Sequence, residues 1–483
     1  MRTKENRLRY KLGYGIADLY GGGAFLIISI LFIFFMTEVV GMNAALAGSI
    51  PFIGRTWDAI TDPFMGALVD RTRSKYGAKR FFILIGSFVA AFTFMLVWVS
   101  IGGGPGLQYL YYLLAFMLFS TGFTIVMVPY NALLPDMVHS YHLRGQYTGI
   151  RMVFSALSAI LGALLPEIII GRFGPDRVKE GYLVMGIVFG FIFLISLLVT
   201  FFNTFEDPLP EKKQPKRPSI RENVYVFKNR AFRMYLGIFL FGQGSVDFIL
   251  ALILYFLTYV LVQPDQYITI MAGVLGAQLF AMVLYQFLLK YHSKKVPIYV
   301  GIPLQILATV LVVFFAYEGA PIWPIVGIAV LLGFGTAAST VTPFAILTDL
   351  ADVDELISTQ RRAGMYAGMA TFSRKIANGV ALGLVGLSLW LFGFDSNAAV
   401  QSDLAVFGIV FVFVAFPLLF LITALFFTAR YPLNNHNFPI LKAELLRRRA
   451  DGTPSDDPAV RDTLEKITGY PYEKLWRVEN VDI

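Results

Sequence analysis

The stretch FFILIGSFVAAFTFMLVWVSI, from Phe81 to Ile101, contains no charged side chain. A helix of about 20 apolar residues is long enough to cross the hydrocarbon core of a bilayer. The stretch therefore predicts a membrane-spanning helix, and it is one of many such runs in the chain.

Composition extends this prediction to the whole chain of 483 residues. Hydrophobic residues make up 57% of it and charged residues only 15%, whereas soluble domains average roughly 45–50% and 25%. A chain with this much apolar surface is predicted to be a polytopic membrane protein. The first residues, MRTKENRLRYK, lack the short apolar core of a cleavable signal peptide, so we expect none. There are no cysteines, which excludes disulfides and thiolate metal sites.

Twelve apolar runs divide the chain, at approximate boundaries 13–40, 45–69, 81–101, 107–134, 150–170, 182–205, 234–262, 268–289, 296–316, 321–347, 364–393 and 404–429. A polar, proline-containing segment separates the sixth run from the seventh, as expected of a linker. The predicted fold class is an all-α polytopic membrane protein with 12 transmembrane helices in two six-helix bundles. The predicted domains are an N-terminal bundle (1–205), a cytoplasmic linker (206–233), a C-terminal bundle (234–429) and a cytoplasmic tail (430–483).

The distribution of Lys and Arg predicts the orientation. Five precede the first run, five lie between the second and third, and the central segment carries more. The loops after runs 1, 3, 7, 9 and 11 carry none, and only the loop after run 5 is an exception. Both termini are therefore predicted to be cytoplasmic, and the net charge of +8 reflects topology rather than nucleic-acid binding.

The two halves resemble each other at one place. PYNALLPDMVHSYHLRGQYTG begins at Pro129, and PFAILTDLADVDELISTQRRAGMYAG begins at Pro343. In each copy Pro and an aromatic residue are followed by an acidic turn and then by an arginine, Arg144 in the first and Arg362 in the second. Two six-helix halves of the same orientation are the parallel repeat of rocker-switch transporters. Convergence of helix caps is the alternative.

Charged residues inside the predicted spans are costly, at roughly 2.5–3.5 kcal/mol each on insertion scales, and mark functional positions. Asp58 and Asp62 are four residues apart, so they share one helix face. Two neighbouring carboxylates repel unless a cation or a proton lies between them, which suits Na⁺ or a coupling proton. The alternative is a pair of interhelical salt bridges with Arg55 and Lys375.

The remaining intramembrane charges allow two interpretations each. Arg151 and Lys375 could bind solute or balance the carboxylates, or they could extend to the cytoplasmic helix ends. Asp247 could contact solute or be a buried, hydrogen-bonded aspartate. Asp18 could line the cavity, and the glycines after it predict close helix packing or a bend.

Charges near the cytoplasmic helix ends predict a gate. The run DRTRSKYGAKR, from Asp70 to Arg80, joins the second and third spans and could clip helix ends together in one conformation. The predicted gate residues are Arg55, Asp70, Arg71, Arg144 and Arg362. No P-loop, zinc signature or nucleophile elbow is present in context, so ATP-driven pumping and enzymatic catalysis have no support.

These motifs resemble those of a known family. GYGIAD (13–18), RTWDAITDPFMGALVDRTRSKYGAKR (55–80), VPYNALLPDM (128–137) and Lys375 are similar to the glycoside–pentoside–hexuronide cation symporters, the melibiose-permease branch of the major facilitator superfamily. The resemblance covers about residues 10–430. It implies alternating access and import of a sugar or related solute with Na⁺, Li⁺ or H⁺.

The resemblance also implies site residues. Asp58, Asp62, Thr371 and Lys375 match the cation-site residues of the family, and Arg151 matches an arginine near the sugar cavity. Two carboxylates that hold galactoside in melibiose permease are replaced here by Gly22 and Met127, and a tryptophan of the sugar site is replaced by Asn131. These departures argue against melibiose and leave amphipathic solutes open. The predicted solute-site residues are Asp18, Gly22, Met127, Tyr130, Asn131, Arg151, Gln243, Asp247 and Asn378.

The sequence thus predicts a monomeric secondary transporter of the cell membrane that carries a sugar-like or glycoside-like solute with a coupling cation. No cofactor and no metal beyond a Na⁺ site are expected; the partners are the solute, the cation and the lipid bilayer. A carrier of a non-sugar amphiphile or organic anion is the alternative within transport. A non-transporting membrane sensor is the alternative outside it. In the tail, FPILKAELLRRRADG predicts a short amphipathic helix.

Overall fold

The computed structural model describes residues 6–138, 141–206, 225–398 and 400–477, without the side chains of residues 70, 141, 142, 290 and 451. Every regular element in this part of the chain is helical. The helices form two compact units. The first unit consists of Met1–Lys213, Leu250–Ala272 and Asn378–Val410, and the second of Gln214–Ile249, Gly273–Ala377 and Phe411–Ile483.

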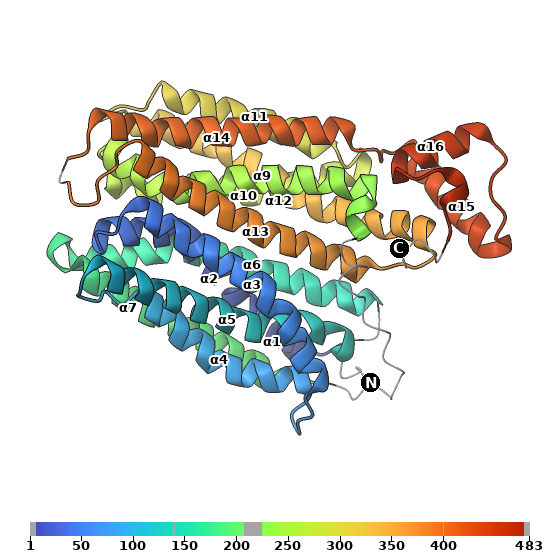
Figure 1. Cartoon of the computed structure of the whole chain (residues 1–483), viewed down its shortest axis with the longest axis horizontal. Coiled ribbons are helices and arrows are strands. Elements are labelled where there is room, and N and C mark those ends of the chain that lie inside the picture. The colour runs from blue at the N-terminus through green and yellow to red at the C-terminus, as the bar shows by residue number, and fades with distance from the viewer. Residues whose placement is uncertain (1–5, 139–140, 207–224, 399, 478–483) are drawn as a thin grey trace. The chain divides into compact units, whose positions relative to one another are not determined.

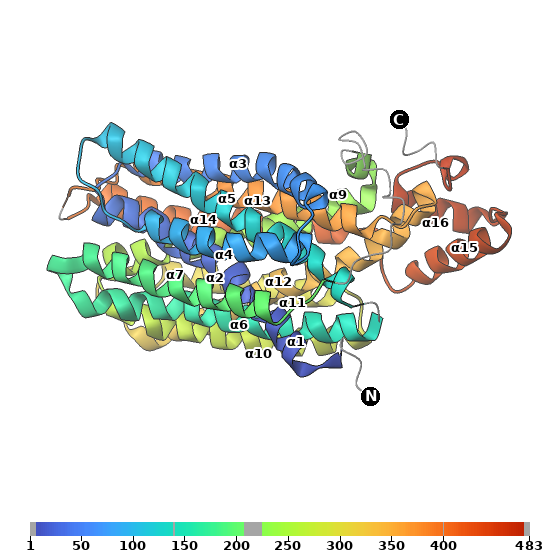
Figure 2. The ribbon, with the colours of Figure 1, turned by 90° about the horizontal axis from the view of Figure 1, so that it is seen from below.

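Seven helices precede residue 207 in the described part of the chain, and Figure 1 labels them in chain order. They are α1 (Leu8–Gly15), α2 (Asp18–Phe34, continued by a π-helical turn over Phe35–Val39), α3 (Ala44–Arg71), α4 (Ala78–Val97), α5 (Pro105–Met137), α6 (Tyr141–Ile170) and α7 (Val178–Phe202). Within the first unit, α4 packs against both α5 and α7, and α2 packs against α6 (Figure 2).

Eight helices follow residue 224 in the described part of the chain. They are α9 (Arg230–Tyr255, continued by a π-helical turn over Phe256–Val260), α10 (Tyr267–Tyr291), α11 (Val296–Val313), α12 (Ile322–Ser358), α13 (Ala363–Leu391), α14 (Asp403–Arg430), α15 (Phe438–Asp451) and α16 (Pro458–Thr468). Within the second unit, α11 lies along α12.

Among the described residues, ten helical stretches are long and apolar enough to cross a bilayer. Two further long helices, α3 and α13, coincide with the predicted spans 45–69 and 364–393 but fall outside that set. Both contain intramembrane charges, among them Asp58 of α3 and Arg374 of α13, and these lower the mean hydropathy of the two helices. The all-helical membrane fold is therefore shown, and the number of spans as twelve stays a prediction.

Several helices extend beyond the apolar runs. The helix α6 begins at Tyr141 rather than at 150, and α12 ends at Ser358 rather than at 347. The first predicted span (13–40) divides into α1 and α2, because residues 16 and 17 form a turn. A hydropathy profile predicts only the apolar part of a helix, so it does not detect polar residues that extend the helix at either end.

The two units share a pattern of side-chain contacts at the starts of α4 and α11. Lys79 forms an ion pair with Asp136 of α5, and Lys294 forms one with Asp349 of α12 at 2.7 Å. In both pairs, a lysine at the start of the third predicted span of a half reaches an aspartate near the end of the fourth. These equivalent ion pairs support the internal repeat.

The next basic residue in each unit caps the last long helix. Arg80 donates a hydrogen bond to the carbonyl of Phe201 at 2.7 Å and lies over its ring. Lys295 donates to the carbonyl of Tyr431 at 2.5 Å and likewise lies over its ring. A cation at a helix C-terminus also interacts favourably with the helix dipole.

The tail is a folded part of the second unit. Leu441 and Leu445 of α15 and Leu464 of α16 are buried in the same core as Leu356 of α12. Figures 1 and 2 show α15 and α16 beside the end of α12. The side chain of Arg449 forms two hydrogen bonds of 2.6 Å with the carboxylate of Glu355, and the predicted amphipathic helix thus covers α12.

Replacing Leu445 by Asp is expected to detach the tail from α12. Leu445 is 1% exposed, and emptying such a site costs about 2–5 kcal/mol even before a charge is buried. Trypsin should then cleave the Leu445→Asp variant within α15 at least tenfold faster. Leu446, which is 64% exposed, provides the matched control, and equal cleavage of Leu445→Asp and Leu446→Asp would contradict the docking.

Candidate functional site

The centre of α3 places a buried guanidinium beside a buried carboxylate. Asp58 has no exposed surface and Arg55 is 6% exposed, with Arg55 Nη1 lying 3.6 Å from Asp58 Oδ2. Arg55 also donates two hydrogen bonds, of 3.1 and 2.7 Å, to the side-chain oxygen of Asn378. Its guanidinium carbon lies 3.5 Å from the centre of the Phe25 ring. The guanidinium of Arg55 is therefore held by Asp58, Asn378 and the ring of Phe25.

Asp62 lies one helical turn further along the same face of α3. The hydroxyl of Thr124 in α5 donates a hydrogen bond of 2.7 Å to Asp62 Oδ1. Pro63 follows and has no N–H, so the carbonyl of Ala59 lacks the usual helical donor. A carboxylate, a hydroxyl and a freed carbonyl are thus brought to one stretch of the helix, and these are the oxygen ligands that hard cations prefer.

A second pair of opposite charges, the buried Asp18 and the partly exposed Arg151, joins α2 to α6. Arg151 Nε lies 3.0 Å from Asp18 Oδ1, and Arg151 Nη1 donates to the side-chain oxygen of Asn131 at 2.9 Å. The guanidinium also lies over the ring of Tyr130, whose hydroxyl donates to the backbone carbonyl of Tyr14. Four of the predicted solute-site residues are therefore in one contact group.

The two positions that lack the carboxylates of melibiose permease are packing positions here. A Cβ atom at Gly22 would lie 3.0 Å from the hydroxyl oxygen of Ser155 in α6. The side chain of Met127 is 7% exposed and covers Gly21, where a Cβ would come within 2.6 Å of its methyl group. Small residues on α2 therefore allow α5 and α6 to approach closely.

The second unit contains its own pair of opposite charges between its first and fifth long helices. Arg374 of α13 donates to both oxygens of Asp247 in α9, at 2.7 and 2.8 Å. Nearby on α9, the amide of Gln243 donates to the carbonyl of Ser339 at 2.8 Å. In each half, therefore, an aspartate of the first predicted span is paired with an arginine of the fifth.

Two predicted cation-site residues, Thr371 and Lys375, belong to α13 in the second unit. The Thr371 hydroxyl donates to the carbonyl of Ala367 in the preceding turn, so its lone pairs can accept or coordinate. Lys375 is half-buried. The structure thus brings Asp58 and Asp62 together in one unit and places Thr371 and Lys375 in the other.

The predicted gate residues lie in different settings. Arg55 lies in the middle of α3 and Arg71 at its end, which places them about 24 Å apart at the rise of an α-helix. Arg55 contacts Asp58 and so belongs with the candidate cation site. The side chain of Asp70 lies outside the described part of the structure. Arg144 donates to the carbonyl of Val138 at 2.7 Å and so caps α5. Arg362 donates to both oxygens of Asp354.

Sequence reasoning missed two partners of the charged residues on α3. Thr124 binds Asp62, and Phe25 covers Arg55, yet neither stands out in an apolar run. Threonines are common in membrane helices, and only the three-dimensional structure shows that this one is opposite a carboxylate. Asn378 accepts hydrogen bonds from Arg55, and its role as a solute contact stays a prediction.

Comparison with known proteins gives symporters as relatives. The chain is 25% identical over 529 residues to an uncharacterized symporter of Synechocystis, covering 91% of this chain and 96% of the relative. It is 25% identical over 449 residues to a provisionally named glycoside/cation symporter of Escherichia coli (92% and 96% covered). It is 26% identical over 403 residues to a sodium-dependent lysophosphatidylcholine symporter of Danio rerio (76% and 75% covered).

The fold is also that of solved transporters. A crystal structure of a D-xylose–proton symporter superposes with a TM-score of 0.60 at 14% identity, covering 87% of this chain and 96% of the other. At this identity the likeness shows the fold alone.

The family assignment follows from the match along almost the whole membrane part of the chain. The sequence model of the family described as “MFS/sugar transport protein” matches residues 13–435. This confirms the predicted family of major-facilitator symporters, and with it a multi-pass membrane transporter rather than an enzyme. The chain belongs to the MFS/sugar transport protein family.

Proposed function

We propose that the protein is a cation-coupled symporter that carries a sugar-like or glycoside-like solute by alternating access. In this proposal the chain crosses the membrane twelve times, as two six-helix bundles with both termini in the cytoplasm. α3 and α13 are then the two spans whose charges do the coupling. The central segment and the tail lie on the cytoplasmic side.

The arrangement around Asp62 carries the proposal. Its carboxylate, the Thr124 hydroxyl and the carbonyl of Ala59, which Pro63 leaves without its usual helical donor, supply oxygen ligands for a bound Na⁺ or Li⁺. The carboxylate can bind H⁺ instead. Thr371 and Lys375 are proposed as further members of the site. The hydroxyl of Thr371 is a ligand of the bound ion, and the ammonium group of Lys375 takes the place of the ion when it leaves.

The group around Arg151 is the proposed solute contact. It combines a charged pair (Asp18 and Arg151), an amide (Asn131) and an aromatic face (Tyr130), which are suited to hydroxyl groups and to the apolar face of a sugar ring. The side chains of Asp18, Arg151 and Asn131 are hydrogen-bonded to one another, so a solute that binds here exchanges internal hydrogen bonds for bonds to its own hydroxyl groups. The family description and the glycoside/cation relative support this class of solute.

A zwitterionic amphiphile is the second candidate solute. The pair Asp18–Arg151 presents both signs of charge and suits a headgroup that itself carries both signs. Gly22 and Met127, in place of two carboxylates, make that region less polar. The relative named as a lysophosphatidylcholine symporter supports this candidate.

Uptake into proteoliposomes tests the proposal. A panel of sugars, glycosides, uronates and lysophospholipids is first screened for thermal stabilisation of the purified protein, with Na⁺ and with choline as the matched control cation. The stabilising solute should then accumulate in liposomes only when an inward Na⁺ or H⁺ gradient is imposed. Binding without any uptake would indicate a sensor, and uptake without dependence on either gradient would refute coupling.

A further inference from the structure

Within the first unit, the C-terminal half of α13 packs closely on α3 through glycines. A Cβ atom on Gly379 would lie 2.8 Å from the Cβ of Arg55, and one on Gly48 would lie 2.9 Å from the Cα of Gly386. Small residues allow two membrane helices to approach until their backbones touch. The neighbour of Gly379, Asn378, is thereby brought against Arg55.

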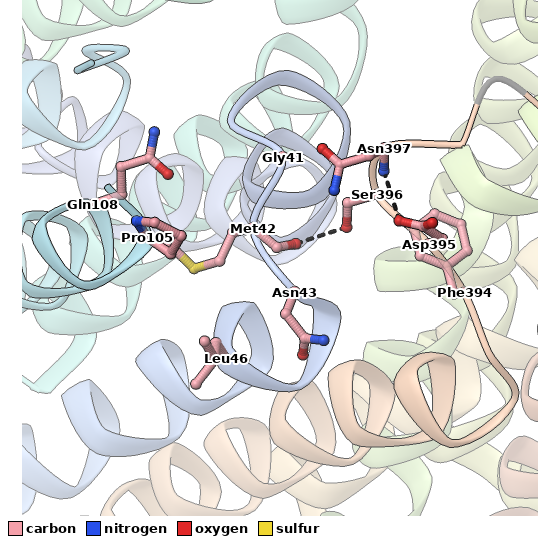
Figure 3. Close-up of a pocket in the computed structure, with 10 residues that line it drawn as sticks. All are labelled: Gly41, Met42, Asn43, Leu46, Pro105, Gln108, Phe394, Asp395, Ser396 and Asn397. Atoms are coloured by element: carbon pink, nitrogen blue, oxygen red, sulfur yellow. Dashed lines mark hydrogen bonds between the residues drawn. The ribbon is translucent and has the colours of Figure 1, made fainter. Parts of the chain in front are cut away.

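The connection after α13 continues this contact with the first unit. The hydroxyl of Ser396 donates a hydrogen bond of 2.7 Å to the carbonyl of Met42, just before α3, beside a pocket of about 220 Å³ (Figure 3). This half of α13 is therefore fixed along α3 both at its end and through its glycines. The position of Asn378 follows from helix packing and does not depend on one side-chain contact.

The guanidinium of Arg55 is shared unequally between α13 and α3. Its Nε and Nη2 both donate to the side-chain oxygen of Asn378, at 3.1 and 2.7 Å. Its Nη1 lies 3.6 Å from Asp58 Oδ2, which is longer than the usual range of about 2.7–3.2 Å for an N–H···O hydrogen bond. Because the guanidinium is a rigid, planar fork, its bonds to Asn378 hold it back from closer contact with Asp58.

This position of the guanidinium matters for a cation bound at Asp62. Asp58 lies one turn before Asp62 on the same face of α3, and residues so spaced have Cβ atoms about 5–6 Å apart. A cation at Asp62 therefore also interacts with the charge of Asp58. A guanidinium in direct contact with Asp58 would neutralise that carboxylate and weaken its attraction for the cation.

We propose that Asn378 is a positioning residue of the cation site, which holds the guanidinium of Arg55 off Asp58 and so favours binding of the coupling cation. This deepens the proposed symport function and rests on it. By linkage, a bound cation in turn favours the contact between Arg55 and Asn378, and with it the packing of α13 on α3. Asn378 thus connects occupancy of the cation site to the helix that carries Thr371 and Lys375.

A double-mutant cycle on the purified protein tests this role. The measured quantity is the Na⁺ concentration that gives half of the maximal rise in Tm, with choline as the matched cation. Asn378→Leu removes the acceptor and lets Arg55 pair with Asp58, so this concentration should rise at least about fivefold. In an Arg55→Met background the same substitution should have no effect, because no guanidinium remains to be positioned.

Two further variants complete the experiment. Asn378→Ser also removes the amide oxygen, and its short hydroxyl bonds within its own helix, so it should show the same shift even if Asn378→Leu does not fold. The control Ser388→Ala removes another buried polar side chain of α13, about 15 Å along the helix, and should respond to Na⁺ as the parent does.

The possible failures are distinguishable. An unchanged Na⁺ requirement in the Asn378 variants, or an equal shift with and without Arg55, would refute the positioning role and leave the cation site standing. A parent protein that is stabilised by neither Na⁺ nor Li⁺ would contradict the site for these ions at Asp62, and with it the positioning role.

Discussion

An Asp62→Asn variant is expected to lose all stabilisation by Na⁺ while keeping its fold. The amide oxygen of the introduced asparagine can still accept the hydrogen bond from Thr124, so the local packing is retained. The carboxylate charge is lost, however, and with it the reason for a cation to bind. In the parent, Na⁺ at 100 times its dissociation constant should add about 2.7 kcal/mol to the free energy of unfolding, read as a rise in Tm against choline.

Two further variants sharpen this prediction. Thr124→Val removes a single hydroxyl ligand, so Na⁺ should still stabilise this variant. The Na⁺ concentration required should be roughly tenfold higher, as expected for a loss of about 1.4 kcal/mol in the free energy of Na⁺ binding. Asp456→Asn changes a fully exposed carboxylate in the tail and should respond to Na⁺ as the parent does. A normal Na⁺-dependent rise in Tm for Asp62→Asn would show that the ion binds elsewhere.

The second large effect is expected at the pair Asp247–Arg374. Replacing Arg374 by Met leaves the side chain of Asp247, which is 5% exposed, without its bidentate partner. Leaving one charge of a buried pair alone costs about 3–5 kcal/mol, so the Tm in detergent should fall by many degrees. The expected change is a loss of folding stability rather than of cation binding.

The double variant Asp247→Leu with Arg374→Met distinguishes charge from packing. Removing both charges eliminates the unpaired carboxylate, and replacement of a buried ion pair by apolar residues is often neutral or stabilising. Most of the lost stability should therefore return. A double variant less stable than Arg374→Met alone would mean that the two side chains contribute mainly through shape and hydrogen bonds to other groups.

The long apolar runs predicted the helices well because hydropathy reports directly on the segment that lies in lipid. The predicted span 45–69 corresponds to α3 (Ala44–Arg71), and the predicted span 296–316 corresponds to α11 (Val296–Val313). The polar extensions of α6 and α12 were not predicted, because their residues do not belong to the apolar runs. The π-turns were also missed, since one extra residue per turn leaves no trace in a hydropathy profile.

In the candidate site, too, some residues could be predicted from the sequence and others could not. Charges within apolar runs select Asp58, Asp62, Arg151 and Asp247 as candidates from the sequence alone, because a charged side chain in lipid is energetically costly. Their partners could not be inferred in the same way. Thr124 is 62 residues from Asp62 and is common in composition, so only the packing of α5 on α3 selects it.

The length of α12 has a mechanical consequence. Its 37 residues extend about 56 Å, whereas a bilayer with its headgroups measures about 40–45 Å. If α12 crosses the bilayer along its normal, roughly 10 Å of the helix extends beyond the headgroups, and this end carries the folded cap made by α15 and α16. A tilt of α12 would then displace the cap further than it displaces the part of the helix in lipid.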